Sequence, residues 1–211
     1  MLEAFALRYI NGVLPAWFFK CTLTVETVGL FKTAEQNPVA VRPVGMRNPF
    51  IKVIHREVMR QNTETIRNFL EPQQLGMSQA GGVKLVHCVR MKLEERPDFI
   101  CVKLDFRNAF NEVKRARIIK VLSEEPSLQH LALHAATVLA PSNGLECGGQ
   151  LWGEAAEGTT QGDPESGSYF CIGMHEYVRA ADSILTEHQG FARFGWDDGY
   201  LVGPQTSYSR L

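Results

Sequence analysis

Two adjacent aspartates, Asp197 and Asp198, interrupt the hydrophobic stretch FGWDDGYLVGP, which ends at Pro204. Strand-favouring residues flank them on both sides, and Asp-Gly is a frequent dipeptide in the tight turns of hairpins. The pattern predicts a β-hairpin over residues 191–202 with both carboxylates at its tip. A polar turn explains the two aspartates by itself, and half of a metal site is the alternative interpretation.

The rest of the chain mixes helical and strand patterns without regular βαβ spacing. Helices are expected over residues 2–19, 48–70, 83–95, 112–122, 127–139 and 168–185, with a bend or an end at Pro15. Strands are expected in a hairpin of TVGLFK and VAVRPVG around the loop TAEQNP, in FICVKLDF, and, mixed with loop, in LECGGQLWGEAAEGTTQGDPESG. The pattern predicts an α+β fold with an antiparallel sheet.

The composition is that of a globular protein, since 45% of the 211 residues are hydrophobic and 21% are charged. No apolar run reaches membrane-spanning length, and no basic segment with a following apolar stretch opens the chain. The five cysteines are scattered and odd in number, which favours reduced thiols over a disulfide framework or a zinc knuckle. We therefore expect an intracellular protein without a membrane partner.

The net charge of −1 hides an uneven distribution of charged residues. Residues 1–120 contain 19 Lys and Arg against 11 Asp and Glu, whereas residues 121–211 contain 3 against 12. A basic half is suited to a polyanion and an acidic half to cations. Two differently solvated faces are the simpler explanation of the charge pattern taken alone.

A third carboxylate, Asp105, ends the hydrophobic segment FICVKLDF, where the chain turns towards a helix. The simpler interpretation is that this aspartate caps the helix. It can also reach the tip of a neighbouring hairpin, where clustered carboxylates repel one another unless cations are bound. Mg²⁺ takes hard oxygen ligands, and two ions about 4 Å apart can activate a hydroxyl and stabilise a leaving pyrophosphate.

The segment EGTTQGDPESGSYF precedes the helix expected from residue 168. Gly158 and Gly162 free its backbone, and Pro164 suits the first turn of a helix. Gln161 is placed to lie against a base or a ribose. A capped loop before a helix is the simpler reading of this segment.

In this order and at these spacings, the three segments resemble motifs A, B and C of the reverse transcriptase palm. DFRNAF is similar to motif A, GTTQGDPESGSYF to motif B and GWDDGYLVGP to motif C. VRPVGM resembles the fingers Arg-Pro motif, and LEPQQLGMSQAGGVKLVHCVR resembles the segment between fingers and palm. NAFNEVKR is most similar to enzymes of non-LTR (LINE-like) retrotransposons, and the resemblance covers roughly residues 28–204.

The resemblance implies an RNA-directed DNA polymerase, a nucleotidyltransferase that adds deoxynucleotides to a primer 3′-hydroxyl in the nucleus. Asp105 and Asp197 would bind two Mg²⁺ or Mn²⁺ ions, and Asp198 would complete the acidic cluster. Phe110 would lie under the incoming sugar and leave no room for a 2′-hydroxyl. The remaining implied contacts are Arg42 and Lys32 with the triphosphate, Gln161 and Gly162 with nucleotide and template, and Arg47, Lys52, Arg56 and Arg60, with Lys114, Arg115 and Arg117 as further candidates, along the RNA template.

The resemblance also implies a division into fingers with the fingers–palm connection at residues 1–98 and palm at 99–211, within one reverse transcriptase domain. The chain stops at Leu211, which leaves no room for the family's thumb. The family usually has an aromatic residue where this chain has Gly195, so Phe194 is expected to supply that ring or the packing of the primer end is altered.

Three other interpretations remain open at this point. A viral RNA-dependent RNA polymerase shares the palm, but it normally has a second Asp at the position of Phe110 and lacks the sequence Gln-Gly-Asp-Pro. A truncated, inactive retroelement remnant would at most bind nucleic acid through the basic half. His130 and His134 have a spacing that can bind zinc on one helix face, although no third ligand is evident.

Overall fold

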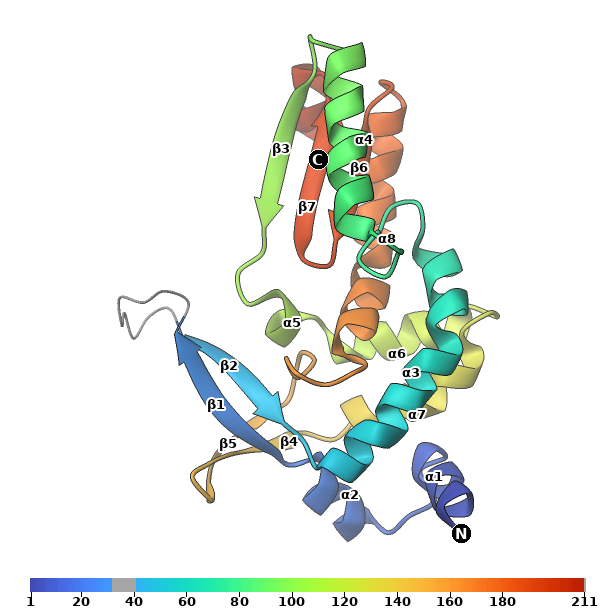
Figure 1. The fold of residues 1–211 in the computed structure, drawn as a ribbon, viewed down its shortest axis with the longest axis vertical. Helices are drawn as coiled ribbons and strands as arrows, with labels where there is room; N and C mark the ends of the chain where they lie inside the picture. The colour runs from blue at the N-terminus through green and yellow to red at the C-terminus, as the bar shows by residue number, and fades with distance from the viewer. Residues whose placement is uncertain (32–40, 211) are drawn as a thin grey trace.

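The computed structural model describes residues 1–31 and 41–210, which form two sheets and a set of helices (Figure 1). The helices are α1 (Leu2–Ile10), α2 (Ala16–Leu23), α3 (Pro49–Leu70), α4 (Gly81–Glu95), α5 (Ala109–Glu112), α6 (Arg115–Glu124), α7 (Ala132–Leu139) and α8 (Ser166–Thr186), with 3-10 helices η2 (Gln129–Leu131) and η3 (Gln205–Arg210). The strands are β1 (Val25–Phe31), β2 (Val41–Met46), β3 (Ile100–Asp105), β4 (Asn143–Cys147), β5 (Gln150–Ala155), β6 (Phe191–Gly195) and β7 (Asp198–Gly203).

One sheet is three-stranded and antiparallel, with the order β3-β7-β6. Val102 and Leu104 of β3 pack with Leu201 and Val178 in an apolar cluster that joins this sheet to α8. Because side chains alternate along a strand, Asp105 lies on the face opposite to these apolar neighbours. The predicted antiparallel sheet with helices packed on it is confirmed, and Figure 1 shows α4 and α8 running along it.

The second sheet has the order β2-β1-β4-β5. The predicted hairpin is present, since β1 pairs antiparallel with β2, and β1 also pairs in parallel with β4. Antiparallel pairing of β4 with β5 confirms strands within the segment that the sequence assigned to strand and loop. The expected hairpin loop lies outside the described residues.

One apolar cluster connects the two halves of the chain. It contains Ile66 and Leu70 of α3 together with Ile118 of α6, Val138 of α7 and Ile172 of α8. Residues on both sides of position 98 therefore share one core, and the division into fingers and palm there stays a prediction. None of the helices in residues 1–31 and 41–210 is both long and apolar enough to cross a bilayer.

The observed helices differ from the predicted ones mainly where the chain interrupts a helix or delays its start. The helix expected over 2–19, with a bend or an end at Pro15, is two helices: α1 ends at Ile10, shortly before Gly12 with its φ of +64°, and α2 begins directly after Pro15. The helix expected over 112–122 begins only at Arg115, after an extended Val113 and Lys114. Helix α3 follows the prediction, with the Asn48 side chain accepting a hydrogen bond from the Phe50 backbone at 3.0 Å.

Candidate active site

The end of β3 and the tip of the β6–β7 hairpin meet at the same end of the three-stranded sheet, close to α5 (Figure 1). Asp105, the last residue of β3, is the register partner of Asp198, the first residue of β7. Asp105 does not cap the following helix, because α5 begins only at Ala109. Backbone pairing, which does not depend on side-chain charge, thus gathers the predicted acidic residues.

The turn of this hairpin is one residue earlier than the sequence suggested. Gly195 pairs with Asp198, so Trp196 and Asp197 form the turn, and the Asp-Gly dipeptide lies in β7. Two-residue hairpin turns need a positive φ, and Trp196 provides it with a φ of +60°. A residue with a β-carbon pays roughly 1–2 kcal/mol for this conformation, so surrounding contacts must hold it.

Asp197 and Asp105 line one cavity of about 140 Å³. The other residues that line this cavity are Pro43, Phe106, Asn108, Ala109, Phe110, Asn111 and Gln161. The walls of this cavity thus combine carboxylate and amide oxygens, which are hard donors of the type that Mg²⁺ and Mn²⁺ prefer. On α8, burial and next the charge of Asp197 raise the pKa of the Cys171 thiol.

Asp198 is oriented differently from the other two carboxylates. Its Oδ1 lies 3.1 Å from Nζ of Lys103, and both side chains are about half exposed. Within the described residues, no three His, Cys, Asp or Glu side chains are close enough together to hold a metal ion as they stand. The structure therefore brings Asp105 and Asp197 to one cavity and leaves Asp198 in an ion pair beside it.

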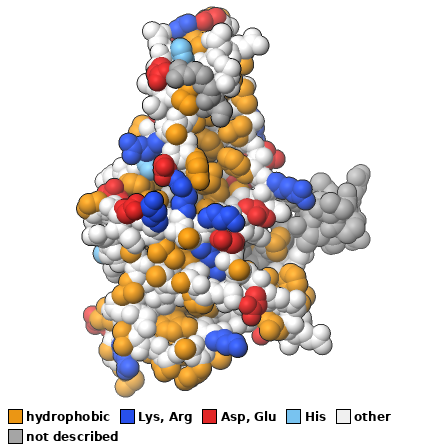
Figure 2. Space-filling model, turned by 180° about the vertical axis from the view of Figure 1, so that it is seen from behind, with side chains coloured by type: hydrophobic (Ala, Val, Ile, Leu, Met, Phe, Trp, Pro, Cys, Tyr) orange, Lys and Arg blue, Asp and Glu red, His pale blue; other side chains and the backbone are white. Residues whose placement is uncertain are grey.

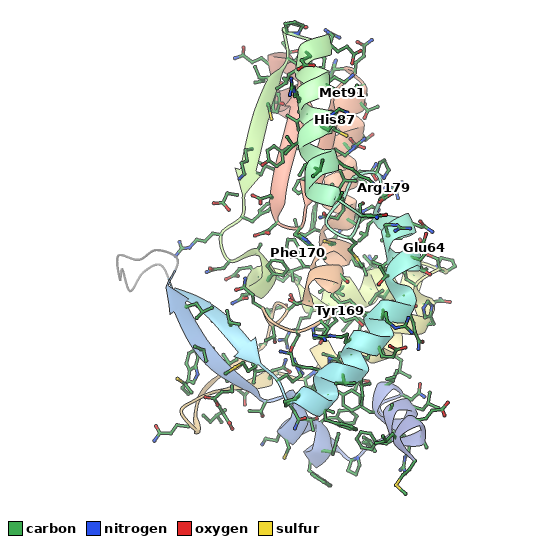
Figure 3. The ribbon with its side chains drawn as sticks, in the orientation of Figure 1. Glu64, His87, Met91, Tyr169, Phe170 and Arg179 are labelled. Carbon is green, nitrogen blue, oxygen red and sulfur yellow. The ribbon has the colours of Figure 1, made fainter. Side chains whose placement is uncertain are left out.

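Phe110 reaches the cavity from α5 while its ring packs against the core. The ring centroids of Phe110 and Phe170 are 4.7 Å apart. Figure 3 shows Tyr169 and Phe170 near the N-terminal end of α8, which packs against both α5 and α3. The position of Phe110 is thus fixed by its contact with Phe170 of α8.

Gln161 is held at the cavity by contact between its loop and β2. The backbone N–H of Gly45 donates to the carbonyl oxygen of Gln161 at 2.8 Å. A β-carbon added at Gly45 would lie 2.2 Å from Cγ2 of Thr160, and one added at Gly162, whose φ is +114°, would lie 2.6 Å from the Gly45 oxygen. Both glycines are therefore needed for the close approach of the two segments.

Two buried side-chain pairs, Arg47 with Asp163 and His55 with Glu165, anchor the start of α8 to the segment around β2 and α3. Arg47 donates to Asp163 with an N–O distance of 2.7 Å, and Nδ1 of His55 lies 2.8 Å from Oε1 of Glu165. Burial by itself would raise the pKa of Glu165, but His55 and then Arg47 outweigh it and lower that pKa to about 2. Arg47 is only 3% exposed, so its interpretation as a template contact is corrected to a structural role.

The other basic residues expected along the template border an open groove. Lys52, Arg56 and Arg60 on α3 line it together with Gly162. Arg60 pairs with Glu57, whereas neither Lys52 nor Arg56 has an ion-pair partner within the described residues. Lys32 and the side chain of Arg42 lie outside the described part, and only the backbone of Arg42 is placed, opposite Leu30.

Of the further basic candidates, Arg115 and Arg117 on α6 make contacts within the fold, whereas Lys114, just before α6, has an exposed side chain. Arg115 is buried and donates to the backbone oxygens of Gly158 at 2.7 Å and Pro141 at 2.9 Å. Arg117 pairs with Glu176, and Nζ of Lys114 lies 3.7 Å from Glu157. Figure 2 shows basic and acidic side chains intermixed across the middle of the rear face, without a patch of one sign.

The zinc interpretation finds no support in the described residues. His134 is buried, its Nδ1 lies 2.6 Å from the Tyr169 hydroxyl, and burial lowers its pKa to about 3. His130 instead hydrogen-bonds to the side chain of Asn62. The two histidines therefore face different partners.

Phe194 does not supply an exposed ring in place of Gly195. Its side chain is 4% exposed and belongs to the apolar cluster beneath the sheet. The sequence did not point to Gln74 as a site residue. Its side chain is 2% exposed and hydrogen-bonds to both the N–H and the carbonyl oxygen of Trp196. The only signal for it was its place in the segment that resembles the fingers–palm connection.

Comparison with known proteins shows a likeness of fold without a likeness of sequence. No family model matches the chain, and no curated protein matches it in sequence. Among solved structures, apo telomerase from Candida tropicalis, truncated from the C-terminal domain, superimposes with a TM-score of 0.62 at 12% sequence identity. The match covers 90% of this chain and 45% of that one, so the chain spans less than half of its length. The likeness shows that the two chains share a fold over the matched part.

Proposed function

We propose that the chain is the fingers and palm of an RNA-directed DNA polymerase of the non-LTR retrotransposon type. The observation that carries the proposal is that Asp105 and Asp197, far apart in the sequence, line one cavity together with Phe110 and Gln161. These four residues come from the three segments that resemble motifs A, B and C. The polymerase-like fold supports the same reading at the level of architecture.

The chemistry follows from the donor atoms of the cavity. Asp105 and Asp197 would hold two Mg²⁺ or Mn²⁺ ions, which supply activation of a primer 3′-hydroxyl and stabilisation of charge on the leaving pyrophosphate. The residues of the chain contribute position and shape. Phe110 places a rigid ring where a 2′-hydroxyl would lie, and the Gln161 amide offers hydrogen bonds to the nucleotide.

The nucleic acid would approach from the side of α3. Lys52 and Arg56 have no ion-pair partner within the described residues and border the groove beside Gly162, so they are available to phosphates. An RNA template there, a DNA primer at the carboxylates and a deoxynucleotide triphosphate are the proposed partners. Arg42 and Lys32 are proposed as triphosphate contacts on the family resemblance alone, and the nucleus as the place of action.

A second candidate is a protein that binds nucleic acid without catalysis. The ion pair of Asp198 with Lys103 favours it, because the third carboxylate is not turned to the cavity. Both candidates predict nucleic-acid binding by the α3 groove. They differ in whether Asp197 matters.

Primer extension separates the two candidates. The full chain is mixed with an RNA homopolymer, a complementary DNA primer and the matching deoxynucleotide, and Mg²⁺ or Mn²⁺ is titrated. The proposal predicts extension that depends on the cation and is lost in Asp197→Ala, while binding of the template and primer persists. Binding without extension, unchanged by Asp197→Ala, contradicts polymerase activity and leaves the binding protein.

A further inference from the structure

A buried glutamine holds the backbone of the turn that carries Asp197. The Oε1 atom of Gln74 accepts hydrogen bonds from the backbone N–H of Trp196 at 2.8 Å and of Gly76 at 2.9 Å. Its Nε2 donates to the carbonyl oxygen of Trp196 at 2.9 Å. Because Gln74 is 2% exposed, water cannot readily replace these bonds.

The segment around Gln74 also extends the sheet beyond β6. The N–H of Phe194 donates to the Gln73 oxygen at 2.8 Å, and the N–H of Leu75 donates to the Phe194 oxygen at 2.7 Å. Gln74 is thereby aligned with Phe194 in a parallel bridge. The backbone on one side of the hairpin turn is thus tied to the segment between α3 and α4.

The Trp196 side chain packs between two glycines, Gly76 and Gly167. A β-carbon added at Gly76 would lie 2.7 Å from Cδ2 of the indole, and one added at Gly167 on α8 would lie 2.3 Å from Cζ3. The indole therefore lies between the connecting segment and α8. It fills the place that both glycines leave open, which explains how Trp196 keeps a φ of +60°.

We propose that Gln74 is a positioning residue, which through Trp196 sets where the Asp197 carboxylate stands relative to Asp105. The effect on catalysis rests on the proposed function, whereas the clamp itself does not. Asp197 follows Trp196 directly, so release of the Trp196 backbone lets the turn relax and separates the two carboxylates. Binding of a shared divalent cation then weakens, because the ligands must be drawn together again.

The neighbouring glutamine provides a matched control. Nε2 of Gln73 donates to Oδ2 of Asp182 at 2.8 Å, away from the turn. Gln74→Met and Gln73→Met each replace one amide by an apolar group of similar length. Both lose hydrogen bonds within the same segment, but only Gln74→Met frees the turn.

Two measurements test the clamp. Hydrogen exchange on the metal-free full chain should accelerate at the Trp196 amide by about tenfold or more in Gln74→Met relative to Gln73→Met. Mn²⁺ binding, followed by electron paramagnetic resonance of the free ion, should weaken about tenfold in Gln74→Met and less than about twofold in Gln73→Met.

The outcomes are separable from the failure of the proposed function. Unchanged exchange at Trp196 in Gln74→Met overturns the clamp, whether or not the protein binds metal. If the wild-type protein does not bind Mn²⁺ through Asp105, the proposed function is contradicted. The exchange rates at Trp196 then still show whether Gln74 holds the turn. Faster exchange with unchanged Mn²⁺ affinity overturns the positioning role.

Discussion

Asp105 lies directly opposite Asp198 in the antiparallel pairing of β3 with β7. This register places the following turn beside the end of β3, so that Asp197 reaches the cavity that Asp105 lines. Main-chain hydrogen bonds therefore assemble the candidate site before any ion is bound. The arrangement also leaves Asp198 next to Lys103.

Lys103→Met should strengthen the binding of Mn²⁺ to the site. The change releases Asp198 from the pair at 3.1 Å and removes a positive charge near the cations. Exposed pairs are weak, so we expect a two- to fivefold gain in affinity, measured by titration calorimetry at low salt. Lys92→Met, which breaks the comparable pair with Glu95 on α4, is the control and should change nothing. Equal affinities in all three proteins would show that Asp198 does not contribute to the site.

Phe110→Ala should relax the discrimination against ribonucleotides. Removal of the ring opens the wall of the cavity where a 2′-hydroxyl would lie, and the ratio of ribo- to deoxynucleotide incorporation should rise about tenfold or more. Single-nucleotide extension assays with each substrate measure this ratio. Phe106→Ala removes another ring from the same cavity and should leave the ratio unchanged. A rise in both variants would indicate general loosening and not a steric gate.

Arg47→Met should destabilise the fold strongly. The change leaves the Asp163 carboxylate buried and unpaired, and loss of one partner of such a pair typically costs about 3–5 kcal/mol. The free energy of unfolding in urea measures it. Restoration of much of the loss in Arg47→Met with Asp163→Leu would confirm the cause. A loss no larger than that of Arg60→Met, which breaks an exposed pair, would contradict it.

His134→Asn should flatten the loss of stability in mild acid. Burial lowers the pKa of His134 from 6.5 to about 3, so the folded state binds fewer protons than the unfolded state between these values. The free energy of unfolding therefore falls as the pH drops below about 6.5. Asparagine keeps a hydrogen bond towards Tyr169 without titrating, and should reduce the fall between pH 7 and pH 5 by about 2 kcal/mol.

Urea unfolding at several pH values measures this difference. Leu133→Asn, at an exposed position of the same helix, should retain the wild-type pH dependence. A pH dependence that is identical in His134→Asn and wild type would show that the histidine does not remain neutral in the fold.

The sequence predicted the elements with strong local signals. Helix α3 begins after Asn48 as expected, because capping by Asn and proline at the first turn are local effects. The hairpin that carries Asp197 was also predictable from its strand-favouring flanks. Its exact turn was not, because Trp196 takes the positive φ that Asp-Gly usually supplies, and packing between Gly76 and Gly167 overrides that preference.

Roles that depend on long-range packing could not be predicted from the sequence. Arginine is usually a surface residue, so the sequence gives no sign that Arg47 is buried. It is buried because the fold brings Asp163, which is far away in the chain, into an ion pair with it. Arg115 likewise looks like part of a basic helix but binds backbone oxygens of distant loops. No local sequence pattern marks Gln74 as important, because its hydrogen-bond partner Trp196 lies much later in the chain.

The most direct test of the site is anomalous diffraction from crystals of the protein soaked with Mn²⁺ and a deoxynucleotide triphosphate. We expect manganese peaks between the carboxylates of Asp105 and Asp197, with Mn–O distances of about 2.2 Å. The peaks should vanish in crystals of Asp105→Asn. Manganese bound elsewhere, with none between these two carboxylates, would contradict a shared metal site.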